Sequence, residues 1–425
     1  MSRLGLHYFP DTNHYRQTDL DTWLPELIAL DVHWLVLRSE ISRAIPEPFL
    51  AGLLQAGITP LIEFRLSLAA PPPPNTITPL LDAYAQWGIR HLLFFDRPNL
   101  RSAWPNPAWA RQNLVERFLD LYLPFAEIAI ERQLNPLFPP LHPGGNYWDT
   151  AFLRASIASL RRRQQLKLLE HLTLSASAWT HNHSLDWGSG GPQQWPNASP
   201  YLTPTGSQDQ RGFCIFDWYT ALAQDELGHP VPIVLLQAGQ PTAPEDAPTP
   251  QPIPEEQTLT IAHLALGEIY TTPNLPRAPI HELPANILAC CLWLLSAEPT
   301  SPHTPQAWYQ PTRQPRPWIE KLKACHPPAS AAKYLPNEQP LFDHYLLLPS
   351  FDWGVPDWHL DFIRPIIKKH RPTIGFSLHE AALARRVTVI ANEQAIPEED
   401  LNALRAAGCR VERITEPGTN LAPFS

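Results

Sequence analysis

Charged residues stand at or just beyond the ends of three successive predicted β-strands, and their types could do chemistry there. Each strand end carries one arginine and one acidic residue: Arg38 with Glu40, Arg65 with Glu63, and Arg97 with Asp96. Two carboxyl groups at one site could divide the roles of general acid and general base between them. Clustered guanidinium groups could instead bind an anionic sugar or a phosphate, because each matches an anion with two parallel hydrogen bonds. A structural alternative is that the charges pair with one another and close the mouth of a barrel.

Aromatic side chains are a second signal, because they gather in segments that follow predicted strands. Tyr147 and Trp148 follow the fifth strand, and Trp293 lies near the end of the eighth. Aromatic faces stack on the apolar faces of sugar rings, so this concentration indicates carbohydrate binding. For a single tryptophan, such as Trp179 or Trp218, anchoring the core or a loop is the alternative.

The segment "HNH" places His181 and His183 on one side of an extended stretch after the sixth strand. A metal site needs a third ligand at a defined spacing, and the sequence offers none. The five cysteines also lack CxxC or Cys/His spacing, so we expect buried free thiols. Residues 341–415 also lack a glycine-rich phosphate-binding motif, so no nucleotide is assigned to them. The sequence therefore predicts polar or sugar contacts for the two histidines, with no metal and no cofactor.

The elements that must position these residues alternate regularly over residues 1–326. Apolar segments rich in β-branched and aromatic residues predict eight strands: 5–9, 33–38, 60–65, 91–96, 135–141, 172–179, 232–239 and 287–295. Amphipathic helical patterns separate them, the longest over 109–134 with a kink expected at Pro124. This alternation predicts a parallel sheet covered by helices, and eight units predict a (β/α)8 barrel. Long Pro-rich and polar inserts follow the strands, as expected where the carboxyl ends of the strands carry a site.

The pattern restarts on a smaller scale after the barrel. Residues 327–340 are predicted to form a linker, 341–415 a small parallel α/β domain, and 416–425 a tail. Four short strands and a helix over 356–370 support this prediction, and the apolar stripe of the helix is expected to pack on the sheet. A protein partner of this domain is an alternative that its sequence leaves open.

Composition limits the classes of function. The formal net charge is -9, and the longest basic run is "RRR" at 161–163, so a nucleic-acid partner is not expected. The chain shows no charged leader with an apolar core and no apolar run long enough for a membrane span, which predicts a cytoplasmic protein without a membrane span. Its 51 prolines and single methionine are typical of a heat-tolerant protein from a thermophile.

Two strand ends resemble the clan A glycoside hydrolases, the (β/α)8 barrels that include cellulases, mannanases and β-xylosidases. In that clan the fourth strand ends in Asn-Glu-Pro, whose glutamate is the acid/base, and the seventh ends in the nucleophilic glutamate. Here the fourth strand ends in Asp96-Arg97-Pro98-Asn99, and the seventh ends in Leu236-Gln237-Ala238-Gly239. The frames match within residues 1–325, and both glutamates are replaced. The resemblance also implies a cleft lined by Arg38, Arg97, Tyr147, Trp148, His181, His183, Gln237 and Trp293.

The two replacements bear on mechanism. A retaining glycosidase needs one carboxyl group to protonate the leaving oxygen and a second to attack the anomeric carbon. Arg97 cannot supply the proton, because its pKa exceeds about 12, and the amide of Gln237 is no nucleophile. The resemblance therefore implies a pseudoenzyme that recognises carbohydrate. Two alternatives stay open: an active hydrolase that uses Glu40, Glu63 or Asp96, and a structural module whose own loops fill the cleft.

Overall fold

A computed structural model describes residues 2–240, 254–267, 282–325, 342–349, 363–365, 367–368, 372–382, 384–393, 395–406 and 408–414. The chain forms two compact units, Met1–His326 and Pro327–Ser425. Several predictions concern residues outside the described ranges: the linker 327–340, the tail 416–425, most of the helix over 356–370, and most of the insert after the seventh strand.

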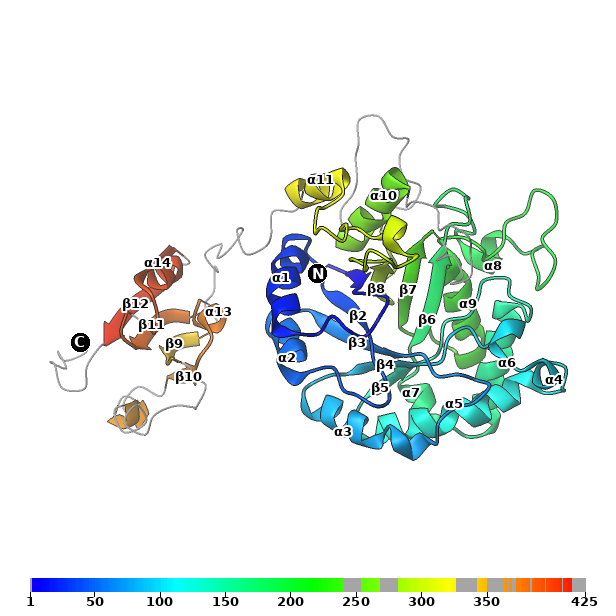
Figure 1. The fold of residues 1–425 in the computed structure, drawn as a ribbon, viewed down its shortest axis with the longest axis horizontal. Helices are drawn as coiled ribbons and strands as arrows, with labels where there is room; N and C mark the ends of the chain where they lie inside the picture. The colour runs from blue at the N-terminus through cyan, green and yellow to red at the C-terminus, as the bar shows by residue number, and fades with distance from the viewer. Residues whose placement is uncertain are drawn as a thin grey trace. The chain divides into compact units, whose positions relative to one another are not determined.

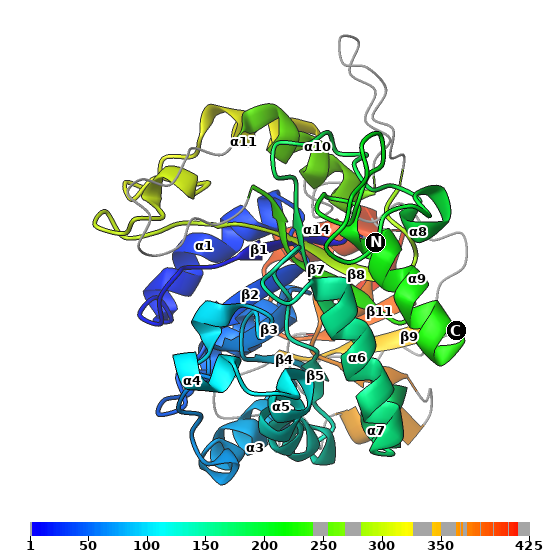
Figure 2. The same cartoon turned by 90° about the vertical axis from the view of Figure 1, so that its right-hand side faces the viewer.

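Eight parallel strands form the first unit, and helices surround them (Figures 1 and 2). Their bounds are β1 Leu4–His7, β2 Trp34–Arg38, β3 Thr59–Phe64, β4 His91–Phe94, β5 Asn135–Leu137, β6 Leu174–Trp179, β7 Ile233–Gly239 and β8 Ile287–Leu292. Neighbouring strands follow one another in sequence, and β8 returns to pair with β1. A bridge between Phe138 and Leu174 joins β5 to β6 and nearly closes the circle. The predicted (β/α)8 barrel is confirmed, although β5 and β8 end earlier than predicted.

The strands separate an inner and an outer apolar layer, because successive side chains point to opposite faces. One cluster takes buried side chains from six strands, which only the barrel interior allows: Val36, Leu61, Leu93, Leu137, Val234, Leu236, Ala289 and Cys291. Gly5 of β1 leaves room for it, since a Cβ at this position would lie 2.6 Å from Cys291 Sγ. The preceding residue, Cys290, belongs to the cluster that includes residues of the helices. Both thiols are free and buried.

The helices of this unit are α1 Gln17–Ala29, α2 Glu47–Gln55, α3 Thr78–Gln86, α4 Asn106–Trp109, α5 Leu114–Glu131, α6 Asp149–Arg162, α7 Leu166–Glu170, α8 Gly191–Gln194, α9 Ile215–Leu227, α10 Glu255–Leu266 and α11 Pro317–Cys325. The prediction of one helix over 109–134 is wrong at its start. Asn113 has a left-handed φ of 61°, which a continuous α-helix cannot contain, so α5 begins at Leu114. None of the described helices is long and apolar enough to cross a membrane.

A four-stranded parallel sheet forms the core of the second unit. Its strands are β9 Phe342–Leu347, β10 Thr373–Gly375, β11 Ala384–Ile390 and β12 Arg410–Ile414, in the order β10-β9-β11-β12. Helices α13 Leu378–Ala381 and α14 Glu398–Ala406 contribute to one buried cluster with Tyr345, Val387 and Val389. The predicted parallel α/β character of this part is confirmed.

Candidate functional site

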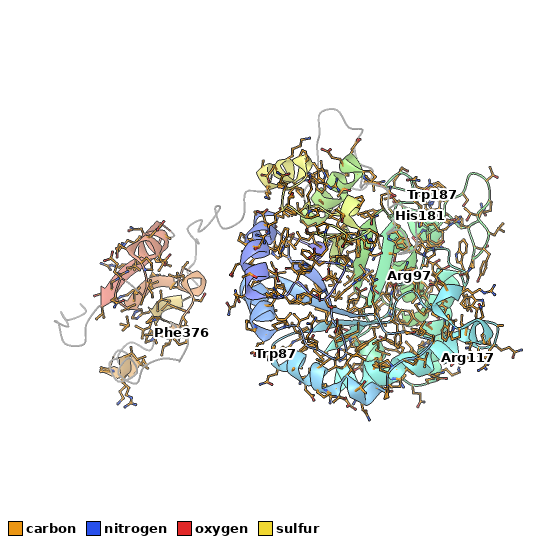
Figure 3. All side chains as sticks on the ribbon, in the orientation of Figure 1. Trp87, Arg97, Arg117, His181, Trp187 and Phe376 are labelled. Carbon is orange, nitrogen blue, oxygen red and sulfur yellow. The ribbon has the colours of Figure 1, made fainter. Side chains whose placement is uncertain are left out.

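The backbone after β4 adopts an uncommon conformation where the predicted site begins. Phe95 has a φ of 66° and Arg97 a φ of 42°, in the left-handed region that few bulky residues enter. The Arg97 N–H donates to the Pro140 carbonyl at 3.0 Å, and Trp104 Nε1 donates to the Pro98 carbonyl at 2.8 Å. These bonds hold the turn, and Figure 3 shows Arg97 beside the strands, whereas Arg117 lies at the outer edge of the unit.

An ion-pair network follows from the register of β2 and β3. Arg38 and Glu63 are direct partners across the two strands, two residues beyond the interior pair of Val36 and Leu61, so they continue the inner face. Arg38 Nε lies 3.6 Å from Glu63 Oε2, and Arg65 Nε lies 3.2 Å from Glu63 Oε1. One buried carboxylate is therefore shared by two guanidinium groups.

Glu63 is 3% exposed, and its protonation state is set by two opposing effects. Burial alone would raise the pKa of its carboxyl group, but the guanidinium groups of Arg65 and Arg38 outweigh burial and hold the pKa below its usual value of 4.5. Glu63 is thus an anion at neutral pH. It cannot serve as the protonated general acid that a glycosidase requires.

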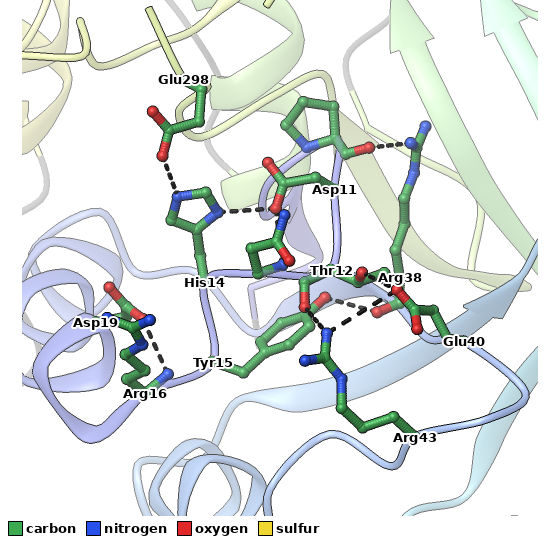
Figure 4. Close-up of polar contacts among 12 residues, drawn as sticks. Asp11, Thr12, His14, Tyr15, Arg16, Asp19, Arg38, Glu40, Arg43 and Glu298 are labelled. Atoms are coloured by element: carbon green, nitrogen blue, oxygen red, sulfur yellow. Dashed lines mark hydrogen bonds and ion pairs between the residues drawn. The ribbon is translucent and has the colours of Figure 1, made fainter.

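Asp96 forms a second pair with its sequence neighbour. Arg97 Nε and Nη2 approach the same oxygen, Asp96 Oδ2, at 2.8 and 2.7 Å. The two side chains are 25% and 30% exposed, so this pair faces solvent more than Glu63 does. Glu63 and Asp96 thus form the ion pairs that the structural alternative predicted for the strand ends. Glu40 differs, because its partners are Thr12 and Arg43 (Figure 4).

Asn99 ties the loop after β4 to the loop after β5. Its fully buried amide donates to the carbonyls of His142 and Tyr147, each at 2.9 Å, and accepts from the His142 N–H at 2.8 Å. These three bonds fix the position of His142 next to Arg97. Burial, followed by the charge of Arg97, lowers the pKa of His142 to about 4, so its ring is neutral at physiological pH.

A cavity of about 530 Å³ opens at this end of the strands. Trp293, which follows β8, lines the cavity although it is only 6% exposed, because His7 at 4.8 Å and His303, edge-on at 5.2 Å, pack against its ring. The charged and polar lining comes from Arg38, Arg65, Asp96, Arg97, Ser67, Ser102 and His142. The strand ends of β2, β3, β4 and β8 therefore contribute to one pocket.

A second cavity of about 530 Å³ adjoins the first and shares Arg38, Arg65, Leu66 and Ser67 with it. Its remaining lining includes Thr12, Glu40 and Glu63. Near the start of α1, a third hollow of about 370 Å³ contains His14 between Asp11 at 2.8 Å and Glu298 at 2.7 Å (Figure 4). These two carboxylates outweigh partial burial and raise the pKa of His14.

The aromatic residues predicted after β5 have packing roles. Tyr147 contacts Phe152 at 5.4 Å, and Trp148 is 7% exposed and packs against Tyr201 and Arg211. Neither of them lines the cavities just described. Trp179 and Trp218 are buried, which fits the anchoring alternative.

The two histidines after β6 lie in the β6 insert, residues 180–212. His181 has a φ of 47° and meets Trp179 edge-on at 5.7 Å, while His183 stacks on Trp187 at 3.9 Å. Gln237 is half-buried on β7 opposite Ser177. None of these residues lines the three described cavities, and no cluster of metal ligands occurs among the described residues.

The sequence analysis missed the two histidines among the residues that line this cavity. His142 follows the fifth strand in "PLHPGG", and its place after a strand end could have identified it. His303 lies in the Pro-rich insert after β8, where no local pattern distinguishes it from other polar residues. Its burial depends on packing against Trp293, which only the folded barrel defines.

No family model matches the chain, and no curated protein matches its sequence. A monomeric β-xylosidase from Caulobacter crescentus superposes with a TM-score of 0.47 at 13% identity, over 76% of this chain and 67% of that one. A calcium-binding mutant of β-glucuronidase 2 from Bacteroides uniformis gives 0.44 at 10% identity, over 82% and 38%. Gas2 from Saccharomyces cerevisiae, in complex with laminaritriose and laminaritetraose, gives 0.41 at 8% identity, over 76% and 63%. The chain spans less than two thirds of the last two proteins. With TM-scores below 0.5 and identities of 13% or less, these similarities support no conclusion about activity. Any argument about activity therefore rests on the residues of the site.

Proposed function

We propose that this chain is a saccharide-binding (β/α)8 barrel that does not cleave glycosidic bonds by double displacement. The observation that carries the proposal is the composition of the first cavity. It joins a large indole ring, Trp293, to hydrogen-bonding side chains at the carboxyl ends of the strands. An aromatic lining residue beside convergent polar groups suits a sugar, because one face of a sugar ring is apolar and its hydroxyls need hydrogen-bond partners.

The carboxylates near this cavity favour binding over hydrolysis. Glu63 is kept ionised by two arginines, and Asp96 contacts Arg97. The exposed carboxyl group of Glu40 has a lowered pKa, first because Thr12 donates a hydrogen bond to it. A hydrolase needs one carboxyl group that stays protonated near neutral pH, and Glu40 and Glu63 are both shifted the other way. By the resemblance of the strand ends to clan A, Arg97 and Gln237 would stand in place of its two glutamates.

The open volume of the cavity separates this proposal from a purely structural role. A module whose own loops filled the cleft would leave little space at the strand ends. Two adjoining cavities of about 530 Å³ each lie among the described residues. Such a volume lies within the range of small-ligand sites.

The test uses the purified full chain in two assays. Calorimetry against a panel of neutral and acidic oligosaccharides should detect binding, and aryl glycosides should release no chromophore. Trp293→Ala should weaken binding at least about tenfold, because ring stacking is lost. Trp87→Ala is the matched control, since Trp87 lies at the outer edge of the barrel unit and should leave binding unchanged (Figure 3). Turnover of aryl glycosides at ordinary enzymatic rates, or equal binding by both variants, would refute the proposal.

A further inference from the structure

The first cavity carries more positive than negative charge. Arg38, Arg65 and Arg97 line it, and Asp96 is its acidic lining residue. Glu63 lies beneath and contacts both Arg38 and Arg65. The neutral ring of His142 adds no charge. Among the described residues, three guanidinium groups and one carboxylate, Asp96, line this cavity, and Glu63 of the adjoining cavity is the second carboxylate nearby, so the excess is positive.

Two arginine clusters on helix surfaces of the barrel unit are balanced in charge: Arg154 and Arg161 contact Asp225 and Glu226, and Arg162 and Arg163 contact Glu116 and Asp120. Arg154 contacts both Asp225 at 3.3 Å and Glu226 at 2.7 Å. Arg163 likewise contacts Asp120 at 2.7 Å and also pairs with Glu116. These pairs sit on helix surfaces and need no further anion. The cavity differs because three arginines line it beside one acidic lining residue, Asp96.

The arginines of the cavity are also reachable and fixed in direction. Arg65 and Arg97 expose 31% and 30% of their side chains, whereas Arg38 exposes 16%. Arg97 extends from a left-handed backbone position that two hydrogen bonds hold in place. A surface ion pair alone does not require such a backbone, while a preorganised ligand site benefits from it.

We propose that the cavity selects saccharides bearing an acidic group, a carboxylate or a sulfate, which Arg65 and Arg97 bind. This inference rests on the proposed saccharide-binding function and names its ligand class. A planar guanidinium group binds either anion through parallel N–H donors. The Trp293 ring would contact the sugar, and the two arginines would contact its charge.

The test compares ligands that differ in charge alone. Uronate trisaccharides, such as trigalacturonate and trimannuronate, are titrated into the full chain alongside the methyl ester of each and sulfated counterparts. An acidic ligand should bind at least about tenfold more tightly than its ester. Arg97→Gln should lower acid affinity about ten- to hundred-fold and ester affinity by a much smaller factor, because the ester loses hydrogen bonds but no charge attraction. Asp96→Asn should tighten acid binding, because it removes the anion that competes for Arg97.

Controls separate the two proposals. Arg154→Gln removes a paired arginine from a helix surface and should alter neither affinity. If Arg97→Gln alone fails to fold, the double variant Asp96→Asn with Arg97→Gln replaces it in the affinity comparison. The melting temperature of the double variant is recorded to show that it is folded. Esters and neutral sugars binding as tightly as acids would overturn the acidic class and leave saccharide binding intact. Inorganic sulfate binding as tightly as the acidic sugars would also overturn it. Absence of binding across the whole panel would overturn both proposals.

Discussion

Glu63 and Asp149 are both buried carboxyl groups in the barrel unit, and the protein treats them in opposite ways. Glu63 lies under the cavity with two guanidinium groups beside it, and its pKa is lowered. Asp149 begins α6 with hydrogen-bond donors alone: the Gly144 N–H at 2.9 Å, the Gln210 amide at 2.6 Å and the Tyr219 hydroxyl at 3.2 Å. Burial dominates there and raises the pKa of Asp149 to about 6. Neutral donors therefore do not replace a cation when a carboxylate is removed from water.

The two groups give opposite pH dependence of stability. Because the pKa of Glu63 is lowered on folding, its contribution is present above 4.5 and is lost as the pH falls further. Because the pKa of Asp149 is raised from 3.8 to about 6, its contribution is present below 3.8 and is lost as the pH rises through about 6. Lowering the pH should therefore remove the stabilising contribution of Glu63 and restore that of Asp149.

Glu63→Gln should have the largest effect. It removes the anion shared by two guanidinium groups, and breaking such a buried pair costs about 3 to 5 kcal/mol of unfolding free energy at pH 7. Urea unfolding followed by circular dichroism measures this loss. Glu40→Gln is the matched control, because Glu40 is 47% exposed and its loss should cost less than about 0.5 kcal/mol. Equal stability of the Glu63→Gln and Glu40→Gln variants would contradict the claim that the two guanidinium groups stabilise the protein through the Glu63 carboxylate.

Asp149→Asn should come next and act in a pH-dependent way. The shift of its pKa from 3.8 to about 6 corresponds to about 3 kcal/mol between the protonated and ionised forms. The stability of the variant relative to the original should therefore rise by up to this amount between about pH 3.5 and pH 7.5. Unfolding curves at several pH values measure the difference. A difference in unfolding free energy that does not change with pH would mean that ionisation of Asp149 does not destabilise the folded protein.

Arg65→Gln should cost about 1 to 2 kcal/mol, since the side chain is 31% exposed and partly screened by solvent. It should also move the acid-induced loss of stability to higher pH, because Glu63 keeps Arg38 but loses the first of its two cations. Stability profiles between about pH 3 and pH 6 check this. An unchanged profile would contradict the role assigned to Arg65.

Tyr219→Phe should have the smallest effect. It deletes one 3.2 Å hydrogen bond to Asp149 and should cost about 1 kcal/mol above pH 6. The cost should shrink below pH 4, where Asp149 is protonated and the donor matters less. Urea unfolding at the two pH values makes the comparison, and a larger cost in acid would argue that Tyr219 supports packing instead.

The sequence predicts the framework well and the site in part. Eight continuous apolar segments were sufficient for the barrel, because buried parallel strands have a distinctive composition. Local patterns cannot show where a strand end turns, so the sequence could not indicate that the rings of Tyr147 and Trp148 pack on Phe152 and Tyr201 just before α6 and do not line the three described cavities.

The lining of the cavity depends on contacts between distant segments. His303 is buried by Trp293 and lines a pocket shared with Arg97, about two hundred residues earlier in the chain. The register that makes Glu63 the partner of Arg38 could be expected from two adjacent strands, and the sequence did place these charges together. The sharing of the Glu63 carboxylate between Arg38 and Arg65 is evident only in the folded structure.

The adjacent thiols of β8 offer a way to watch this barrel open. Cys290 lies in the layer that includes the helices and Cys291 in the interior, and burial raises the pKa of Cys290 to about 12 and the pKa of Cys291 well above its usual value. An alkylating reagent needs an exposed thiolate, so native molecules should react at neither position. Modification of Cys290 would report separation of the helical shell from the strands, and modification of Cys291 would report rupture of the ring of strands. One dipeptide could thus rank the two events by their rates.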